Sequence, residues 1–280
     1  MADKRWSLDD IPWDRFDPGK LDADLIKVIK AASMVESNGG DYARYLCNVF
    51  AGDAGFQAAA KAWAAEEVQH GQALGRWAEM ADPGFDSAAS FQRFTAGYAL
   101  PLEATASVRG SRAGELVARC IVEVGTSSYY SALGSAAREP VLMNICRRIA
   151  ADEFRHYKLF YRHLKRYLAI ERVSKLRRIR VALGRIGESG DDELAYAYYA
   201  ANGAPGEPYE RKRWSRAYTA RAFSYYRPAH VERGIAMTFK AVGLAPRGVL
   251  ARWTSRGAYR LMQSRQRRAA ALSGAGAVRP

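Results

Sequence analysis

The chain has 280 residues, of which 49% are apolar and 26% charged, and this balance excludes wholesale disorder. No apolar run approaches the roughly 18 residues that a membrane-spanning helix requires. The formal net charge is +14, but residues 1–170 carry 21 basic and 21 acidic side chains while residues 171–280 carry 22 and 8, which indicates a boundary near residue 170.

Helical patterns cover most of the first part of the chain, and no alternating strand pattern of any length is visible. Residues 1–19, with Pro12, Pro18 and Gly19, are expected to form an irregular N-terminal arm. The long helices are expected at about 22–50, 56–80, 111–137 and 140–169, with a short helix near 91–99. Two hairpins joined by a longer crossover would make residues 20–170 a four-helix bundle.

Beyond residue 170 the helical pattern is interrupted and basic. Helices are expected at about 172–186, 210–226 and 247–268, with a loop rich in Gly and Pro at 202–208. The fold class is therefore all-α, with residues 171–280 as a basic helical extension of the bundle.

The pattern Glu-x-x-His occurs twice, as Glu67-Val68-Gln69-His70 in the second long helix and Glu153-Phe154-Arg155-His156 in the fourth. A spacing of three residues places both side chains on one helical face. Glu36 precedes the first motif by 31 residues, and Glu123 precedes the second by 30. A turn signal lies near the midpoint of each interval, so folding each hairpin there brings the carboxylates level, deep in the bundle.

Four carboxylates and two imidazoles are the ligand set of ferritin-like di-iron or di-manganese bundles. Two divalent cations would neutralise four carboxylates, whose burial without metal is costly. Oxygen and nitrogen donors suit Fe or Mn. The alternative is that these are ordinary groups of a helix surface, with Glu66, Glu67 and Asp152 facing solvent. The apolar surroundings of Glu123, in Cys120-Ile121-Val122-Glu123-Val124-Gly125, favour the metal site.

Two segments, Ala65-Glu66-Glu67-Val68-Gln69-His70-Gly71 and Ala151-Asp152-Glu153-Phe154-Arg155-His156, resemble the metal motifs of the soluble acyl-carrier-protein desaturases. That family belongs to the ferritin-like superfamily, together with the ribonucleotide reductase small subunit. Glu123-Val124-Gly125-Thr126 is similar to the desaturase helix that supplies a Glu and, three residues later, a Thr. The resemblance covers about residues 30–165; the chain is shorter than a plant-type desaturase, and its basic C-terminal third matches nothing in the family.

The resemblance implies a role for each matching residue. The metal ligands would be Glu36, Glu67, His70, Glu123, Glu153 and His156, with Glu67 and Glu153 bridging two Fe ions; an Mn/Fe pair stays open. Asp152 would hydrogen-bond a ligating His and fix its tautomer. Thr126 would assist proton delivery, or else bond back to its own helix. The resemblance also implies a homodimer.

The expected function is that of an oxygen-dependent di-iron oxidase, a desaturase or hydroxylase, acting on an acyl or lipid chain. An external electron donor is expected, because no flavin or iron–sulfur motif is visible. Two alternatives stay open. One is a ferroxidase or peroxide-scavenging ferritin-like protein, and the other is a non-catalytic lipid-associated scaffold.

The basic extension is expected to face an acidic partner. Arg252, Arg256 and Arg260 form a stripe at helical spacing, with Leu250, Trp253 and Leu261 beside it, which is typical of an interfacial helix. An anionic membrane surface or an acidic acyl carrier protein would fit, whereas no nucleic-acid motif is present.

Three cysteines without a CxxC pair exclude a disulfide framework and a Cys₄ zinc site. The first residues lack the apolar core of a signal peptide. We therefore expect a cytoplasmic protein, with peripheral binding to the inner membrane face as an additional hypothesis.

Overall fold

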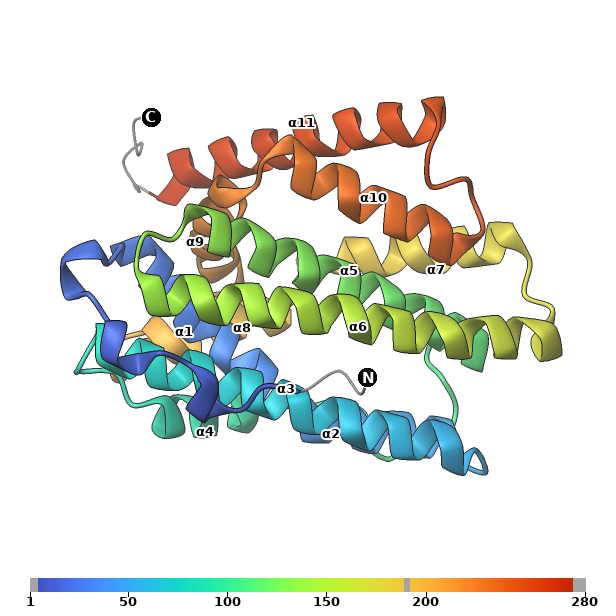
Figure 1. Cartoon of the computed structure of the whole chain (residues 1–280), viewed down its shortest axis with the longest axis horizontal. Coiled ribbons are helices and arrows are strands. Elements are labelled where there is room, and N and C mark those ends of the chain that lie inside the picture. The colour runs from blue at the N-terminus through green and yellow to red at the C-terminus, as the bar shows by residue number, and fades with distance from the viewer. Residues whose placement is uncertain (1–4, 189–191, 274–280) are drawn as a thin grey trace.

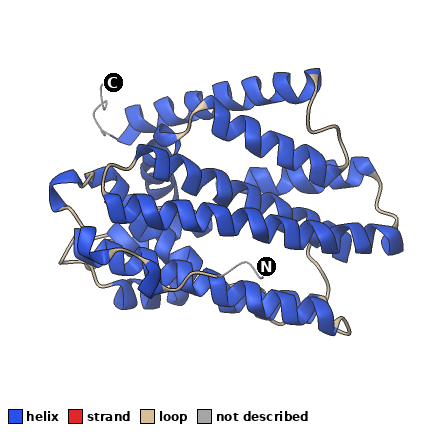
Figure 2. Ribbon diagram, in the orientation of Figure 1, coloured by secondary structure: helices blue, strands red, loops and turns tan. Residues whose placement is uncertain are grey.

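The computed structural model describes residues 5–188 and 192–273 (Figure 1). These residues form α-helices and short 3-10 turns, and no strand occurs among them (Figure 2), so the all-helical prediction is confirmed. The helices are α1 (Ala23–Ser37), α2 (Gly39–Val49), α3 (Ala54–Ala81), α4 (Ser87–Gly97), α5 (Arg112–Ala136), α6 (Pro140–Glu171), α7 (Lys175–Glu188), α8 (Asp192–Asn202), α9 (Arg211–Ala222), α10 (Pro228–Val242) and α11 (Val249–Ser273).

The helices α1, α3, α5 and α6 form the centre of the molecule, with α1 packed on α3 and α5 on α6 (Figure 1). Each begins at a residue whose side chain accepts backbone N–H groups of the first turn, namely Asp22, Asp53, Ser111 and Glu139. Such N-caps satisfy donors that have no partner within the helix. Pro140 follows Glu139 at the first helical position, where its missing N–H costs nothing.

The helix expected over residues 22–50 is in fact two helices, which meet at Asn38. The reason is the close approach of this segment to α3. A Cβ atom at Gly39 would lie 2.7 Å from the Cβ of Glu67, and one at Gly71 would lie 2.3 Å from Ser37 Oγ. The break thus lies just after Glu36. Because Gly39 and Gly71 have no side chain, the backbones of α1, α2 and α3 can meet beside the first Glu-x-x-His motif.

Two apolar clusters flank the middle of the central helices. One contains Leu74 and Trp77 of α3 with Leu133 and Ile145 of the α5–α6 pair. The other contains residues on the far side of the Glu-x-x-His motifs: Trp63, Leu116, Val117, Phe160 and Leu164. The buried Glu and His side chains lie between these clusters, so apolar packing on both sides fixes the helices that carry them.

The segment after α6 packs onto the central helices. It begins where Arg172 adopts the left-handed conformation (φ 52°) and ends α6. Helices α7 and α10 lie on α5, α8 lies on α1, and α11 covers α9 and α10 (Figure 1). The helices α8 and α10 were not expected from the sequence. The described residues contain no helix that is long and apolar enough to cross a membrane.

The N-terminal arm, described from residue 5 onward, contains three 3-10 turns: η1 (Leu8–Asp10), η2 (Trp13–Arg15) and η3 (Pro18–Lys20). Trp6, just before the first of these turns, stacks its ring on the His70 ring, with 5.9 Å between the ring centroids. The arm therefore reaches the buried centre and covers one side of it.

Candidate metal centre

Four helices bring the six predicted ligands together at the centre of the molecule, and none of the six is more than 6% exposed. The contributions are Glu36 from α1, Glu67 and His70 from α3, Glu123 from α5, and Glu153 and His156 from α6. The interpretation of these side chains as a solvated helix surface is therefore wrong. Pairing each Glu with the Glu-x-x-His motif some 30 residues later correctly identified residues that lie together.

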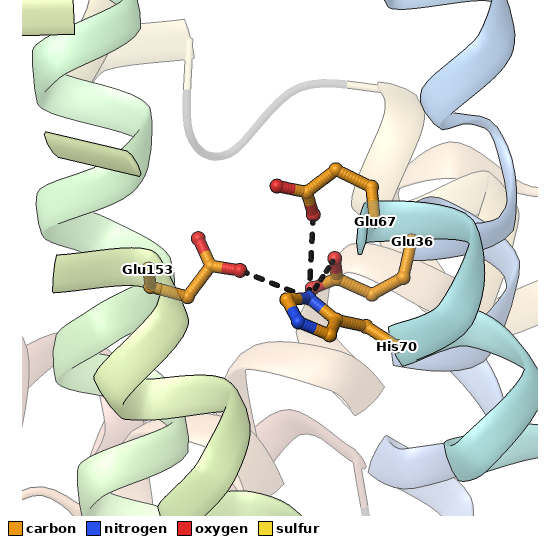
Figure 3. Close-up of side chains that lie close together, drawn as sticks. All are labelled: Glu36, Glu67, His70 and Glu153. Atoms are coloured by element: carbon orange, nitrogen blue, oxygen red, sulfur yellow. Dashed lines mark ion pairs between the residues drawn. The ribbon is translucent and has the colours of Figure 1, made fainter. Parts of the chain in front are cut away.

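The six side chains form two overlapping groups whose donor atoms lie within 4.8 Å of one another. Glu36 and His70 belong to the first group and Glu123 and His156 to the second, while Glu67 and Glu153 belong to both. In Figure 3 Glu153 approaches His70 from one side, and Glu36 and Glu67 approach from the other. The Nδ1 atom of His70 lies 3.2 Å from Glu153 and 3.6 Å from Glu67.

Five buried atoms of this cluster form no well-aligned hydrogen bond in the described part of the chain, although some lie close together, as His156 Nδ1 and Glu67 Oε1 do at 2.9 Å. They are Glu67 Oε1, His70 Nδ1, Glu123 Oε1, Glu153 Oε1 and His156 Nδ1. Leaving one buried donor or acceptor unsatisfied costs about 1–3 kcal/mol, and more for a charged group. Five such atoms in one place therefore fit the coordination of metal ions by carboxylates and imidazoles. The cluster could hold a metal ion.

Each histidine directs its second nitrogen to a carboxylate on the opposite helix. His70 of α3 has Nε2 3.0 Å from Asp152 of α6, and His156 of α6 has Nε2 3.1 Å from Glu66 of α3. These carboxylates hold Nε2 protonated and leave Nδ1 free to ligate a cation. Asp152 thus lies where the sequence analysis expected it. Glu66, considered there only as a solvent-facing residue, occupies the equivalent place immediately before the Glu of its motif.

Further side chains bond to Asp152 and Glu66, the two outer carboxylates that lie behind the histidines. The Trp6 indole N–H donates to Asp152 at 2.6 Å, and Arg155 donates to both Asp152 and Glu66. Arg5 pairs with Glu66 at 2.9 Å. Sequence reasoning missed Trp6, because nothing in an irregular arm indicates where it folds back.

Two hydroxyl groups bond to carboxylates of the cluster. Thr126 Oγ1 donates to Glu153 Oε2 at 2.5 Å, and Tyr130 OH donates to Glu36 Oε1 at 2.5 Å. Thr126 also lies 3.2 Å from the Val122 carbonyl, so the expected bond to its own helix is present together with the contact to the cluster.

The cluster keeps protons when no cation is bound. Burial and the neighbouring carboxylates raise the pKa of Glu36 and Glu123 well above the ordinary value. Burial lowers the pKa of His70, but contacts with the carboxylates of Asp152 and Glu153 more than offset it and raise the pKa well above 6.5. Burial likewise raises the pKa of Glu67, but contacts with Glu36 and His156 leave it well below 4.5.

A cavity of about 370 Å³ adjoins the cluster between α1 and α5. Glu36, Glu67, Glu123, Glu153 and Thr126 line one part of it. Most of the remaining wall is apolar, and the later helices supply much of it, for example Leu194, Phe223, Ile235 and Met262. The volume is within the range of small-molecule sites, about 300–1,000 Å³.

Comparison with models of known protein families finds no match, and comparison with curated proteins finds no similar sequence. The buried cluster of carboxylates and imidazoles, with an apolar cavity at its side, is therefore the feature from which function must be argued.

Proposed function

We propose that the protein is a ferritin-like oxidase with a dinuclear metal centre, which uses oxygen to dehydrogenate or hydroxylate an acyl or lipid chain. The observation that carries this proposal is the convergence of five unpartnered buried donor atoms beside a cavity with apolar walls. Helices α1, α3, α5 and α6 would form the four-helix bundle, and Glu67 and Glu153, which belong to both donor groups, would bridge the two ions.

The chemistry that a bound Fe pair or Mn/Fe pair supplies is the activation of dioxygen toward an unreactive C–H bond. The chain's own residues would hold the metal ions, orient the ligating histidines and position protons. Asp152 and Glu66 fix the histidine tautomers, and Tyr130 holds a proton at Glu36. The Thr126 hydroxyl donates to Glu153 at the cavity wall, where it would deliver a proton to the reacting centre. The electrons would come from an external donor.

The cavity favours this activity over a ferroxidase. A protein that oxidises only its own iron needs no space for an organic molecule, whereas here the cluster lines a cavity of about 370 Å³ with largely apolar walls. The cluster also disfavours a purely structural scaffold, since a scaffold gains nothing from burying four carboxylates next to one another.

The test is metal content followed by oxygen consumption. After anaerobic loading with Fe(II), we expect two metal ions per chain in the wild type and in Glu232→Ala, a control at an exposed Glu of α10. Glu67→Ala should lose metal. With a chemical reductant supplied as the electron donor, oxygen use should continue beyond one turnover and increase on addition of fatty acids or lipids. Oxygen use that depends on Fe(II) alone would indicate a ferroxidase, and a wild type that keeps no metal would refute the enzyme proposal.

We also propose that α11 binds an anionic lipid surface. Its solvent face carries Leu250, Trp253 and Leu261, which are 63%, 66% and 55% exposed. Arg252, Arg256 and Arg260 are exposed beside them. An exposed apolar strip beside a cationic stripe is the pattern of a helix that lies in a membrane interface. Because α11 also contributes Ala258 and Met262 to the cavity wall, such a surface would lie close to the candidate site.

A further inference from the structure

Arg119 is a buried cation that makes no ion pair among the described residues, and the carboxylate that feels its charge, Glu123 one turn along α5, belongs to the cluster. It is only 8% exposed and lies in the wall of the cavity. Its guanidinium packs against the rings of Tyr42 and Trp63, at 5.3 Å and 5.6 Å from their centroids. Within the described residues it forms neither a hydrogen bond nor an ion pair. A buried charge without a partner is strongly unfavourable, so this position calls for an anion.

A second arginine faces the same cavity from α7. The side chain of Arg185 is 21% exposed, and its nearest acidic partner is Glu188, at 3.9 Å. Glu188 is already engaged by Arg109, which donates two hydrogen bonds of 2.5 Å to it. Arg185 and Arg119 both line this cavity, and burial together with the charge of Arg119 lowers the pKa of Arg185. Arg185 therefore keeps N–H donors for a further acceptor.

The acidic groups outside the cluster that lie near these two arginines in the described chain are already engaged. Glu188 pairs with Arg109 and Arg185, and Glu115 is held by Tyr45 and Ser107 at 2.9 Å and 2.7 Å. The metal cluster supplies no compensation once loaded, since two divalent ions balance its four carboxylates. A monoanion would give Arg119 the ion pair that it lacks, and a planar carboxylate matches the fork of donors that a guanidinium presents.

We propose that Arg119 and Arg185 bind the carboxylate of the substrate, so that the substrate is a free carboxylic acid with an apolar body. The proposal rests on the proposed oxidase function, because it names the substrate class of that site. Arg119 precedes Glu123 by one helical turn, about 6 Å along the axis of α5. The bond attacked at the cluster would then lie only a few carbon atoms from the carboxylate.

The apolar body would extend in the opposite direction along α5. Past Glu123 the cavity is lined by Thr126 and Tyr129 of α5, and then by Phe223, Ile235 and Met262 of the later helices. These walls offer no charged group to a second polar end until Glu193, whose Oε1 atom is buried and unpartnered. One anionic end and one apolar end are therefore what the cavity accommodates.

The test compares binding of decanoate and of decanol to the metal-loaded protein by isothermal titration calorimetry. We expect the wild type to bind decanoate at least tenfold more tightly than decanol. Arg119→Gln and Arg185→Gln should each weaken decanoate binding tenfold or more and leave decanol binding unchanged. Arg180→Gln, an exposed position on the same helix as Arg185, is the matched control and should bind both like the wild type.

Two results would overturn the proposal. One is equal affinity of the wild type for decanoate and decanol. The other is decanoate binding that persists in both arginine variants and disappears on removal of metal, since the carboxylate would then be a metal ligand. Arg119→Lys, which keeps the charge, and Arg185→Gln, at a partly exposed position, guard against misfolding of Arg119→Gln.

Metal analysis of the same samples separates this proposal from the oxidase proposal. A protein without metal that still selects decanoate through Arg119 refutes the oxidase and keeps the subsite. A metal-loaded protein that does not distinguish decanoate from decanol refutes the subsite alone.

Discussion

Glu66 on α3 bonds to His156 on α6, at 3.1 Å, rather than to the histidine of its own motif. Asp152 and His70 form the reciprocal pair at 3.0 Å. Each motif thus supplies the carboxylate that orients the other motif's histidine, so the two helices hold each other's ligands in place.

Loss of either outer carboxylate should weaken metal binding without removing a ligand. Outer carboxylates of this kind are worth roughly 10–100-fold in metal affinity. We expect Glu66→Gln and Asp152→Asn each to lower Fe(II) affinity by about that factor, measured by competition with a chelator. Glu103→Gln, at an exposed Glu that pairs with Arg44, is the control. Unchanged affinity in both variants would contradict the orienting role.

Metal binding should release protons. Burial and the neighbouring carboxylates raise the pKa of Glu36 and of Glu123 in the metal-free protein, whereas ligation requires the charged form. The apparent affinity should therefore rise with pH and fall as the medium becomes more acidic. Calorimetry of Fe(II) binding in buffers of different ionisation enthalpy measures the number of protons released, and a value of zero would contradict this expectation.

Glu193 should make stability fall as pH rises. Burial raises the pKa of this Glu to about 7 from 4.5, so the folded state binds its proton more tightly than the unfolded state does. The stabilising contribution of the protonated Glu193 is fully present below pH 4.5 and is lost as the pH rises through about 7. Glu193→Gln should be more stable than the wild type by about 1–3 kcal/mol near pH 8 and equal to it near pH 4. Urea unfolding at both pH values measures this, and a pH-independent difference would contradict it.

Gly71 should tolerate no side chain. A Cβ atom there would lie 2.3 Å from Ser37 Oγ and 2.6 Å from Ser37 N, so alanine must push α1 away from α3. We expect Gly71→Ala to cost about 1–3 kcal/mol in unfolding free energy and to weaken metal binding by moving Glu36. At Gly184 in α7, a Cβ atom would meet no atom within 4 Å apart from the adjacent backbone of its own helix. Gly184→Ala should therefore be neutral or stabilising by up to about 1 kcal/mol. Equal stability of the two variants would show that α1 and α3 can separate freely.

The cationic stripe of α11 should govern binding to vesicles. Replacing Arg252, Arg256 and Arg260 by Gln removes three charges, each worth about 1 kcal/mol at an anionic surface. We expect sedimentation with phosphatidylglycerol vesicles to be lost, and binding to pure phosphatidylcholine to be weak throughout. The control replaces Lys158, Arg162 and Lys165, an exposed stripe of α6. Equal loss in both triple variants would indicate a general charge effect, and no loss would contradict a lipid-binding α11.

The sequence was informative where function depends on local spacing. Glu67 and His70, three residues apart, must share a helical face, and their distance from Glu36 placed the hairpin turn. The break at Asn38 depends instead on contact with α3, which a single-segment pattern does not contain. Helix α8 was not predicted because its run of Ala and Tyr has no polar face. Arg119 was not predicted as a binding residue because its burial in the cavity wall depends on tertiary packing.

The helices after residue 171 close the groove between α1 and α5, while all six donor side chains come from the residues before it. The donor side chains and much of the apolar wall thus come from different stretches of the chain, although Arg119 and other wall residues belong to the first. Replacement of wall residues such as Ile235 or Met262 would therefore reshape the cavity and leave the six donor side chains unchanged.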